Sequence, residues 1–279
     1  MRVTDYLARI GIAPPVGATL DTLRRIHLAH RETFLFENLT IQNGGAISVD
    51  VADLERKFLD EGRGGYCFEH NTLFKAALTD LGFAPITLLG RVRRGPPERW
   101  CRTHMVLRVP GVPRVPNVPG VPDVPGVPGV PGVPGVLDVL ADVGFGGLGL
   151  LEPIEMRDGA TAAQGGITYT LRRDDPLWVL SMRDADGNAM DLYEFTDDPQ
   201  TPWDIVVANH FTSTHPESVF RKTLTIQKAS RDERVILRGD VLTRYVDGHM
   251  METSLDPAGV SAAVSTRLES RRRTAAAGR

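Results

Sequence analysis

The sequence contains few cysteines and little net charge. Only 2 of its 279 residues are Cys, and the formal charge is −3 because basic and acidic residues nearly balance. So small a charge gives no general attraction to nucleic acid or to an anionic membrane. Neither a run of about 18 apolar residues, as a membrane helix requires, nor the apolar centre of a secretory signal is present. We therefore expect a cytoplasmic protein whose thiols, Cys67 and Cys101, stay reduced, which favours a catalytic role for at least one of them.

The remaining composition is that of an ordinary globular protein with one conspicuous segment. With 42 % hydrophobic and 24 % charged residues, the chain can bury one large core or two or three smaller ones. Residues 110–135 hold 9 Pro, 6 Gly and 8 Val, with Pro at every third position. Collagen also requires an uninterrupted Gly at every third position, and Arg114, Asn117 and Asp123 interrupt it here. We therefore expect a flexible, polyproline-biased loop.

Hydrophobic periodicity divides the chain into a helical first part and a β-rich remainder. Apolar residues recur at three- and four-residue steps through residues 1–85, which predicts helices, including one over residues 68–81 that Gly82 would cap. Short β-branched and aromatic runs then predict strands, and Asp186-Gly187 predicts a hairpin turn. The expected strands cover residues 86–92, 104–109, 136–143, 167–171, 178–182, 223–227 and 234–239; a helix or linker covers residues 203–210, and a last helix covers residues 258–268.

Cys67 is the first candidate for a catalytic residue. It follows Gly64, Gly65 and Tyr66 and opens the predicted helix, where unsatisfied N–H groups favour a thiolate and lower the thiol pKa. The two glycines would let the backbone approach a substrate closely. A lone cysteine is more often a small buried hydrophobic residue. The Gly-Gly pair directly before Cys67 favours the catalytic interpretation.

A cysteine nucleophile needs a base, and the base needs a group that orients it. His104 opens an apolar β-like run, so a strand would hold its ring rigidly. Asp142 lies in another apolar run, where burying an unpaired carboxylate would be costly. Either residue alone is more often a satisfied polar group at a strand edge. Together, and in the order Cys67, His104, Asp142, they favour a catalytic triad.

Four ordered segments resemble the motifs of the arylamine N-acetyltransferase family. They are Arg63-Gly-Gly-Tyr-Cys67, Thr103-His-Met-Val-Leu-Arg-Val109, Asp142-Val-Gly-Phe-Gly146 and Asn209-His-Phe-Thr-Ser-Thr-His-Pro-Glu-Ser218. Residues 34–39 and 224–227 agree with the family in order and position. The resemblance therefore spans nearly the whole chain, apart from the repeat and the last ten or so residues.

The resemblance implies an α+β fold with a transglutaminase-like Cys-His-Asp core. Its three expected parts are an N-terminal helical bundle over residues 1–85, a central β-barrel over residues 86–195, and a linker with a C-terminal α/β lid over residues 196–279. The barrel would contain the flexible insertion at residues 110–135, and the lid would end in a basic flexible tail with Arg271 to Arg273.

The resemblance also implies ping-pong acyl transfer without a metal. Cys67 would take the acetyl group of acetyl-coenzyme A (acetyl-CoA) as a thioester, and an arylamine, arylhydrazine or N-hydroxyarylamine would then attack it. His104, oriented by Asp142, supplies the base, while the backbone N–H of Cys67 and a donor near Thr103 stabilise the oxyanion. The expected partners are small-molecule substrates, and the expected assembly is a monomer or homodimer.

The substrate contacts follow from the same resemblance. Phe36, Phe145 and Thr103 are expected to bind the acceptor, because flat apolar faces suit an aromatic amine. The expected contacts to coenzyme A (CoA) are Gly144, Gly146, Phe211, Ser213 and Thr214. Phenylalanines at such spacings are more commonly core residues, and Ser-Thr pairs are more commonly turn residues.

Other interpretations of these residues are weaker. Gly144–Gly149 matches a dinucleotide-binding fingerprint, but Pro153 interrupts the helix that a Rossmann fold needs after it. Cys101 could rival Cys67, yet three-residue spacing along a strand would put Cys101 and His104 on opposite faces. The Cys and His residues show no recurrent metal-ligand spacing. Two functional alternatives stay open: another thioester-forming Cys-His-Asp acyltransferase or amide synthase, and a structural or binding module with a vestigial site.

The repeat lies between two members of the predicted triad. His104 and Asp142 are 38 residues apart, and their separation falls to 12, a hairpin spacing, without residues 110–135. We therefore interpret the repeat as an expanded hairpin tip where the family has a short turn. Lengthening a loop from about 4 to about 30 residues costs roughly 2 kcal/mol of closure entropy, which a domain of this size tolerates.

Overall fold

The computed structural model describes residues 1–14, 17–114 and 135–266. Residues 115–134, which hold most of the Pro-rich repeat, lie outside the described residues, and so does the tail with Arg271 to Arg273. The expectations for these two segments stay predictions.

Helices form the first part of the chain, as the periodicity predicts. Local caps explain where two of them begin, because Thr19 Oγ1 accepts from the Thr22 N–H and the Asp50 side chain accepts from the Ala52 N–H. The helices are α1 (Val3–Arg9), α2 (Leu20–Thr33), α3 (Leu39–Gln42), α4 (Val51–Glu55), followed by a π-helical turn over Arg56–Asp60, and α5 (Cys67–Asp80).

Helix α5 is the helix on which the candidate site is built. It ends just before Gly82, whose φ of +86° confirms the predicted left-handed cap. Its buried side chains, among them Phe68, Leu73 and Phe74, belong to the main hydrophobic core. The helix contacts strand β3 (Arg102–Pro113), which brings its first turn beside the strand that carries His104.

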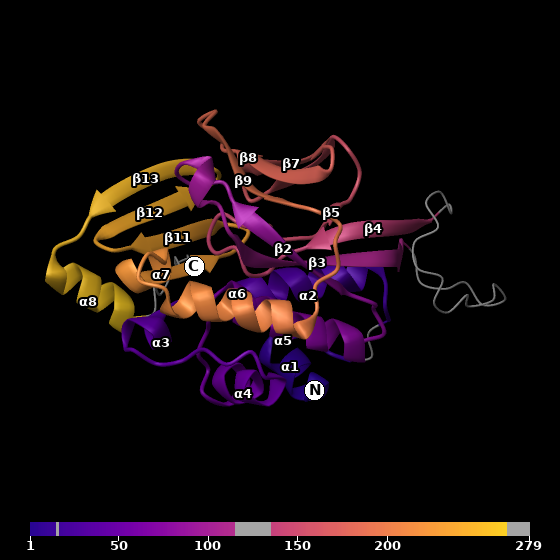
Figure 1. The fold of residues 1–279 in the computed structure, drawn as a ribbon, viewed down its shortest axis with the longest axis horizontal. Coiled ribbons are helices and arrows are strands. Elements are labelled where there is room, and N and C mark those ends of the chain that lie inside the picture. Colours follow the sequence, from indigo (N-terminus) through magenta and orange to yellow (C-terminus); the bar gives the residue numbers. More distant parts are fainter. Residues whose placement is uncertain (15–16, 115–134, 267–279) are drawn as a thin grey trace, which may run out of the picture.

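The central part is an eight-stranded antiparallel sheet that is nearly closed. The strand order is β5-β4-β3-β2-β9-β8-β7-β6, and the two edge strands, β5 and β6, contact each other. The strands other than β3 are β2 (Ile86–Val92), β4 (Val136–Ala141), β5 (Ile154–Glu155), β6 (Ala160–Gln164), β7 (Ile167–Asp174), β8 (Leu177–Arg183) and β9 (Ala189–Phe195). Helices α1–α5 lie on one side of the molecule, and β7–β9 lie on the opposite side (Figure 1).

Alternate residues of β3 serve two hydrophobic cores. Met105 and Leu107 pack in the core shared with the helices, whereas Val106 packs in the core enclosed by the eight-stranded sheet. The strand is therefore buried on both faces, and it can hold a side chain at a fixed position.

The repeat is inserted at the tip of the β3–β4 hairpin. Pro113 pairs with Val136, and the Arg114 N–H donates to the Gly135 carbonyl at 2.8 Å. This pairing confirms the hairpin interpretation. The prediction that the loop starts at residue 110 is wrong, however, because residues 110–113 form the end of β3. The burial of Val112 stabilises this part of the strand after a bulge.

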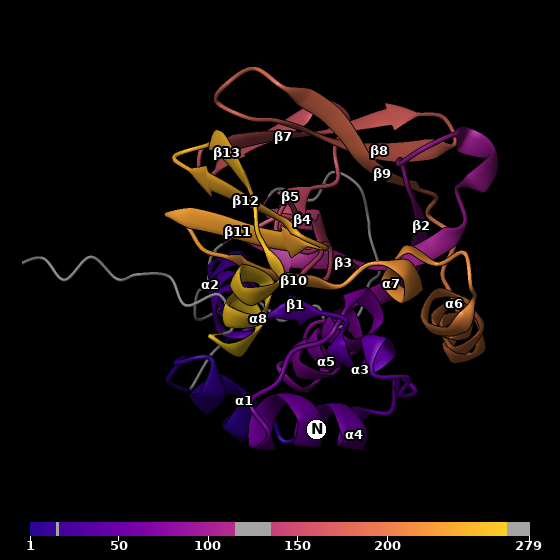
Figure 2. The same ribbon diagram turned by 90° about the vertical axis from the view of Figure 1, so that its left-hand side faces the viewer.

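The last part of the chain forms two helices, a second sheet and a final helix. The predicted helix or linker at residues 203–210 is helix α6 (Pro202–Thr214), and α7 (Val219–Lys222) follows it. The sheet has the antiparallel order β1-β10-β11-β12-β13, and its edge strand β1 (Phe36–Glu37) comes from the helical part. The other elements are β10 (Thr225–Ala229), β11 (Glu233–Arg238), β12 (Val241–Val246), β13 (His249–Ser254) and α8 (Pro257–Ser265). The view in Figure 2 shows this sheet above the helices and beside the barrel-like sheet.

Candidate active site

The start of α5 is held by the segment before it. A β-carbon at Gly64 would collide with the Leu35 carbonyl, and one at Gly65 would collide with the Glu69 side chain. Gly65 also donates to the Leu35 carbonyl at 3.2 Å and accepts from the Glu37 N–H at 2.7 Å. The two glycines therefore let the chain approach its own strand β1, and the expectation that they let the backbone approach a substrate stays a prediction.

A buried ion pair supports the first turn of α5. The Glu69 carboxylate accepts from the Tyr66 N–H at 3.0 Å and from Lys57 Nζ at 2.6 Å. Burial raises the pKa of Glu69 to about 7 against the opposing effect of Lys57. The Tyr66 hydroxyl bonds to the Asn209 side chain of α6. Because these contacts come from several elements, the position of Cys67, the first residue of α5, is well defined.

His104 and Asp142 form a buried pair beside this helix. His104 Nε2 lies 2.8 Å from Asp142 Oδ2, and the two residues are 2 % and 0 % exposed. Strand β3 carries His104, and strand β4 ends directly before Asp142. Because these two strands pair, they bring His104 and Asp142 together although the repeat separates the two residues in the sequence. The His104 ring also packs edge-on against Phe145, with ring centroids 5.1 Å apart. With Nε2 bound to the carboxylate, Nδ1 is the ring nitrogen that can serve Cys67.

Asp142 is held as a carboxylate by its hydrogen bonds. It accepts from Asn71 Nδ2 at 2.9 Å and from the Gly144 N–H at 2.8 Å, and its own N–H donates to His27 Nε2 at 3.1 Å. Burial alone would raise the pKa of Asp142, but the His104 pair and the hydrogen bonds outweigh burial and lower the pKa to about 2. The carboxylate can therefore orient the His104 ring.

The surroundings of Cys67 do not by themselves favour a thiolate. Burial raises the pKa of the Cys67 thiol, the Met105 N–H lowers it, and the Asp142 carboxylate raises it further. The sequence predicts a lowered pKa from the helix N-terminus, and for the isolated thiol that prediction is wrong because desolvation dominates. An ionised Cys67 sulfur would consequently need a cation beside it, and His104 lines the same cavity as Cys67.

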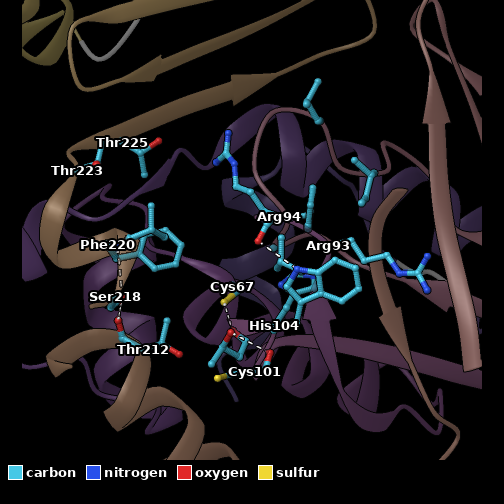
Figure 3. Close-up of a pocket in the computed structure, with 18 of the residues that line it drawn as sticks. Cys67, Arg93, Arg94, Cys101, His104, Thr212, Ser218, Phe220, Thr223 and Thr225 are labelled. Atoms are coloured by element: carbon cyan, nitrogen blue, oxygen red, sulfur yellow. Dashed lines mark hydrogen bonds between the residues drawn. The ribbon is translucent and has the colours of Figure 1, made fainter. Parts of the chain in front are cut away.

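A cavity of about 700 Å³ opens beside Cys67 and His104, and both residues line it (Figure 3). Five of the eight residues expected to contact substrates line the same cavity: Phe36, Thr103, Gly144, Phe145 and Phe211. The Thr103 carbonyl lies 3.7 Å from Cys67 Sγ. Aromatic walls and a volume in the range of small-molecule sites suit an aromatic substrate.

The other three expected CoA contacts lie outside the lining of this cavity. Gly146 turns with a φ of +86° and packs against the Gln227 side chain. The Ser213 and Thr214 hydroxyls donate to carbonyls four residues earlier in α6, at 2.8 and 2.6 Å. Thr214 lines a separate surface hollow on α6. Helical geometry turns the Ser213 and Thr214 hydroxyls toward the backbone. The contacts of all three residues to CoA stay predictions.

Cys101 lines the cavity as well. It is exposed and precedes β3, which begins at Arg102, so the alternation of side chains along a strand does not apply to it. The expectation that Cys101 faces away from His104 is therefore wrong. Cys67 differs from Cys101 in being buried and in opening a helix.

Several residues at the site carry no motif that marks them in the sequence. Arg94 and Trp100 come from the connection between β2 and β3, and Arg238 comes from the end of β11. The sequence does indicate Asn71, because it lies four residues after Cys67 and so occupies the same face of α5. Nothing in the sequence indicates that His27, which lies on α2 and bonds to the Asp142 backbone, belongs to the site.

The described residues contain no group of three or more His, Cys, Asp and Glu side chains that could hold a metal ion. Among the helices of that part of the chain, none is long and apolar enough to cross a membrane.

A family model described as N-acetyltransferase matches residues 19–112 and 133–268. The interval between the two matched ranges falls on the repeat, as expected of an insertion in the β3–β4 hairpin.

Individual proteins are similar over nearly the whole chain. An arylamine N-acetyltransferase from Mycolicibacterium smegmatis is 34 % identical over 270 residues, which cover 92 % of this chain and 87 % of that protein. An arylamine N-acetyltransferase / N-hydroxyarylamine O-acetyltransferase from Salmonella typhimurium is 32 % identical, with coverage of 88 % and 80 %. The structure of Mycobacterium marinum arylamine N-acetyltransferase in complex with CoA superimposes with a TM-score of 0.81 at 30 % identity, with coverage of 95 % and 92 %.

Proposed function

The chain belongs to the arylamine N-acetyltransferase family, and we propose that Cys67, His104 and Asp142 are its catalytic triad and that acetyl-CoA is its acetyl donor. The observation that carries the proposal is the buried pair of His104 and Asp142 beside Cys67 on a cavity with aromatic walls. The similar M. marinum structure in complex with CoA supports the choice of donor. The S. typhimurium relative, an arylamine N-acetyltransferase / N-hydroxyarylamine O-acetyltransferase, supports arylamines and N-hydroxyarylamines as acceptors.

The first half-reaction acetylates the enzyme. Cys67 gives its proton to His104 Nδ1, and its sulfur attacks the acetyl carbonyl of acetyl-CoA. The bond between the acetyl carbon and the CoA sulfur then breaks, and the leaving thiolate takes the proton from His104. Asp142 stays ionised throughout, because its pKa of about 2 lies far below neutral pH. Backbone N–H groups at the start of α5 stabilise the oxyanion.

The second half-reaction transfers the acetyl group to the acceptor. The amine nitrogen attacks the thioester carbon, the bond to Cys67 Sγ breaks, and His104 accepts the proton that the amine loses. The acceptor ring lies between Phe36 and Phe145, near the Thr103 carbonyl. Arylhydrazines react in the same way, and N-hydroxyarylamines accept the acetyl group on oxygen. Gly144 and Phe211 contact CoA from the cavity wall.

A burst experiment tests this proposal. Acetyl-CoA added without an acceptor should release one equivalent of CoA per active site and leave one acetyl group on the peptide that contains Cys67, as measured by chromatography and mass spectrometry. Cys67→Ser should keep its circular dichroism spectrum and give no burst. Cys101→Ser is the matched control, because it removes the other thiol of the cavity, and it should keep the burst. A wild-type enzyme without a burst would contradict acetyl transfer through Cys67.

A further inference from the structure

The cavity wall carries an excess of positive charge although the whole chain is acidic. The net charge of the chain is −3. Two more cationic than anionic side chains line the cavity: Arg93, Arg94, Arg99 and Arg238 against Asp191 and Glu217. A local field of this sign inside a cleft favours an anionic ligand.

The two carboxylates of the wall already have cationic partners. Asp191 accepts from Arg93 at 2.5 Å and from Arg172 at 2.7 and 2.8 Å. Glu217 accepts from Lys222 Nζ at 2.7 Å. Arg93 also donates to Glu194. Glu217 also feels the charge of Arg99. Neither carboxylate is hydrogen-bonded to Arg94 or Arg238.

Arg94 and Arg238 are the two arginines that matter here. Within residues 1–14, 17–114 and 135–266, neither guanidinium has a carboxylate partner or donates a hydrogen bond. They are near enough to repel each other, since burial and the charge of Arg94 lower the pKa of Arg238 to about 10. Arg238 is still protonated at neutral pH, and desolvating an unpaired cation beside another one is unfavourable. An anion between them would remove both penalties.

We propose that Arg94 and Arg238 form an anion subsite that binds an oxyanion group of a substrate in this cavity. A guanidinium donates two parallel hydrogen bonds to a carboxylate or a phosphate, so the shared ligand chemistry is a planar or tetrahedral oxyanion. Its two possible sources are a carboxylate on the aromatic acceptor and a phosphate of acetyl-CoA. The inference rests on the proposed function, because it deepens the substrate specificity of the same cavity.

Paired substrates test the subsite. The variants are Arg238→Met and Arg94→Met, which remove the charge and keep an unbranched side chain. One arm compares 4-aminobenzoate with the neutral 4-aminobenzamide as acceptors for acetyl-CoA. The other arm compares acetyl-CoA with S-acetylpantetheine, which lacks all phosphates, with 4-aminobenzamide as acceptor. Arg244→Met is the matched control, because Arg244 bonds to Glu233 on the same sheet and lies outside the cavity lining.

The expected result is a selective rise in KM. Losing a charge-assisted contact should raise the KM of the anionic substrate by about 10- to 100-fold and leave its neutral counterpart within about twofold. A selective rise for 4-aminobenzoate identifies the acceptor carboxylate as the ligand, and one for acetyl-CoA identifies a phosphate. Equal changes for the charged and neutral members of both pairs, or no change, would overturn the subsite. If the proposed function itself fails, the wild-type enzyme will turn over neither 4-aminobenzamide nor S-acetylpantetheine. That result distinguishes failure of the proposed function from failure of the subsite.

Discussion

Asn71 is predicted to hold the catalytic carboxylate in position. Its Nδ2 donates to the Met105 carbonyl at 2.7 Å and to Asp142 Oδ1 at 2.9 Å, and its Oδ1 accepts from the Val143 N–H at 3.1 Å. One amide thus joins helix α5, which begins with Cys67, to strand β3 and to the segment that follows β4. Asn71→Ala removes all three bonds without touching a member of the triad.

The magnitude of the effect follows from burial. Asn71 is 0 % exposed, so its three former partners would lose hydrogen bonds in a site closed to solvent. At about 1 to 1.5 kcal/mol for each bond, and more for the ionised partner, the free energy of unfolding should fall by roughly 3 to 5 kcal/mol. A carboxylate free to shift by about 1 Å should also slow acetylation of Cys67 by roughly 10- to 100-fold.

The assay pairs Asn71→Ala with Gln164→Ala. Gln164 is also a buried amide with three hydrogen bonds, at 2.7, 3.1 and 2.9 Å, but its partners are the backbone groups of Leu151 and Glu152. Urea unfolding should show comparable destabilisation in both variants. The burst rate with acetyl-CoA, and the pH profile of Cys67 alkylation by iodoacetamide, should change only in Asn71→Ala. If both variants acetylate at the wild-type rate, Asn71 supports the fold alone and the reasoning fails.

Two further predictions concern the hairpin and the carboxylate. Deleting residues 115–134 joins Arg114 to Gly135 as a two-residue turn after the Pro113 and Val136 pair. Acetyl transfer should then stay within about twofold of wild type, and the free energy of unfolding should rise by up to about 2 kcal/mol because the loop to be closed is shorter. An inactive but folded product would mean that the repeat takes part in function. The Asp142 pKa of about 2 lies below its ordinary value of 3.8, so ionised Asp142 stabilises the fold by about 2 kcal/mol above pH 4, and this contribution is lost as the pH falls toward 2. The difference in unfolding free energy between wild type and Asp142→Asn should therefore shrink by about 1 kcal/mol from pH 5 to pH 3, and a constant difference would contradict the assigned pKa.

Elements with a strong local signal were predicted from the sequence almost to the residue. Helix α5 occupies Cys67–Asp80 against a prediction of residues 68–81, and β2 occupies Ile86–Val92 as predicted. Strands β1, β5, β6, β12 and β13 were not predicted, and β9 was implied only by the turn at Asp186-Gly187. Every residue of β13 is exposed, so it has no alternating apolar pattern and forms because β12 pairs with it.

The environment of each site residue was less predictable than its identity. The pKa of the Cys67 thiol depends on burial by other elements, which outweighs the helix terminus that the sequence reveals. The placement of Ser213 and Thr214 depends on how α6 is turned, and their hydroxyls bond to its backbone. Gly64 and Gly65 are required by a close approach to Leu35 and Glu69, which no local pattern indicates.

The sequence by itself determined which residues are the candidates for the chemistry, because residue type and order along the chain carry the Cys67, His104 and Asp142 pattern. It also determined that the repeat is an insertion between paired strands, because hairpin spacing is a local property. Only the tertiary structure decided that the Cys67 thiol is buried and that burial raises its pKa. The same holds for Arg94 and Arg238, which line one cavity, each without a carboxylate partner among the described residues. The reason is that desolvation and Coulomb energies depend on distances between elements far apart in the chain, and those distances exist only once the helices and both sheets have packed.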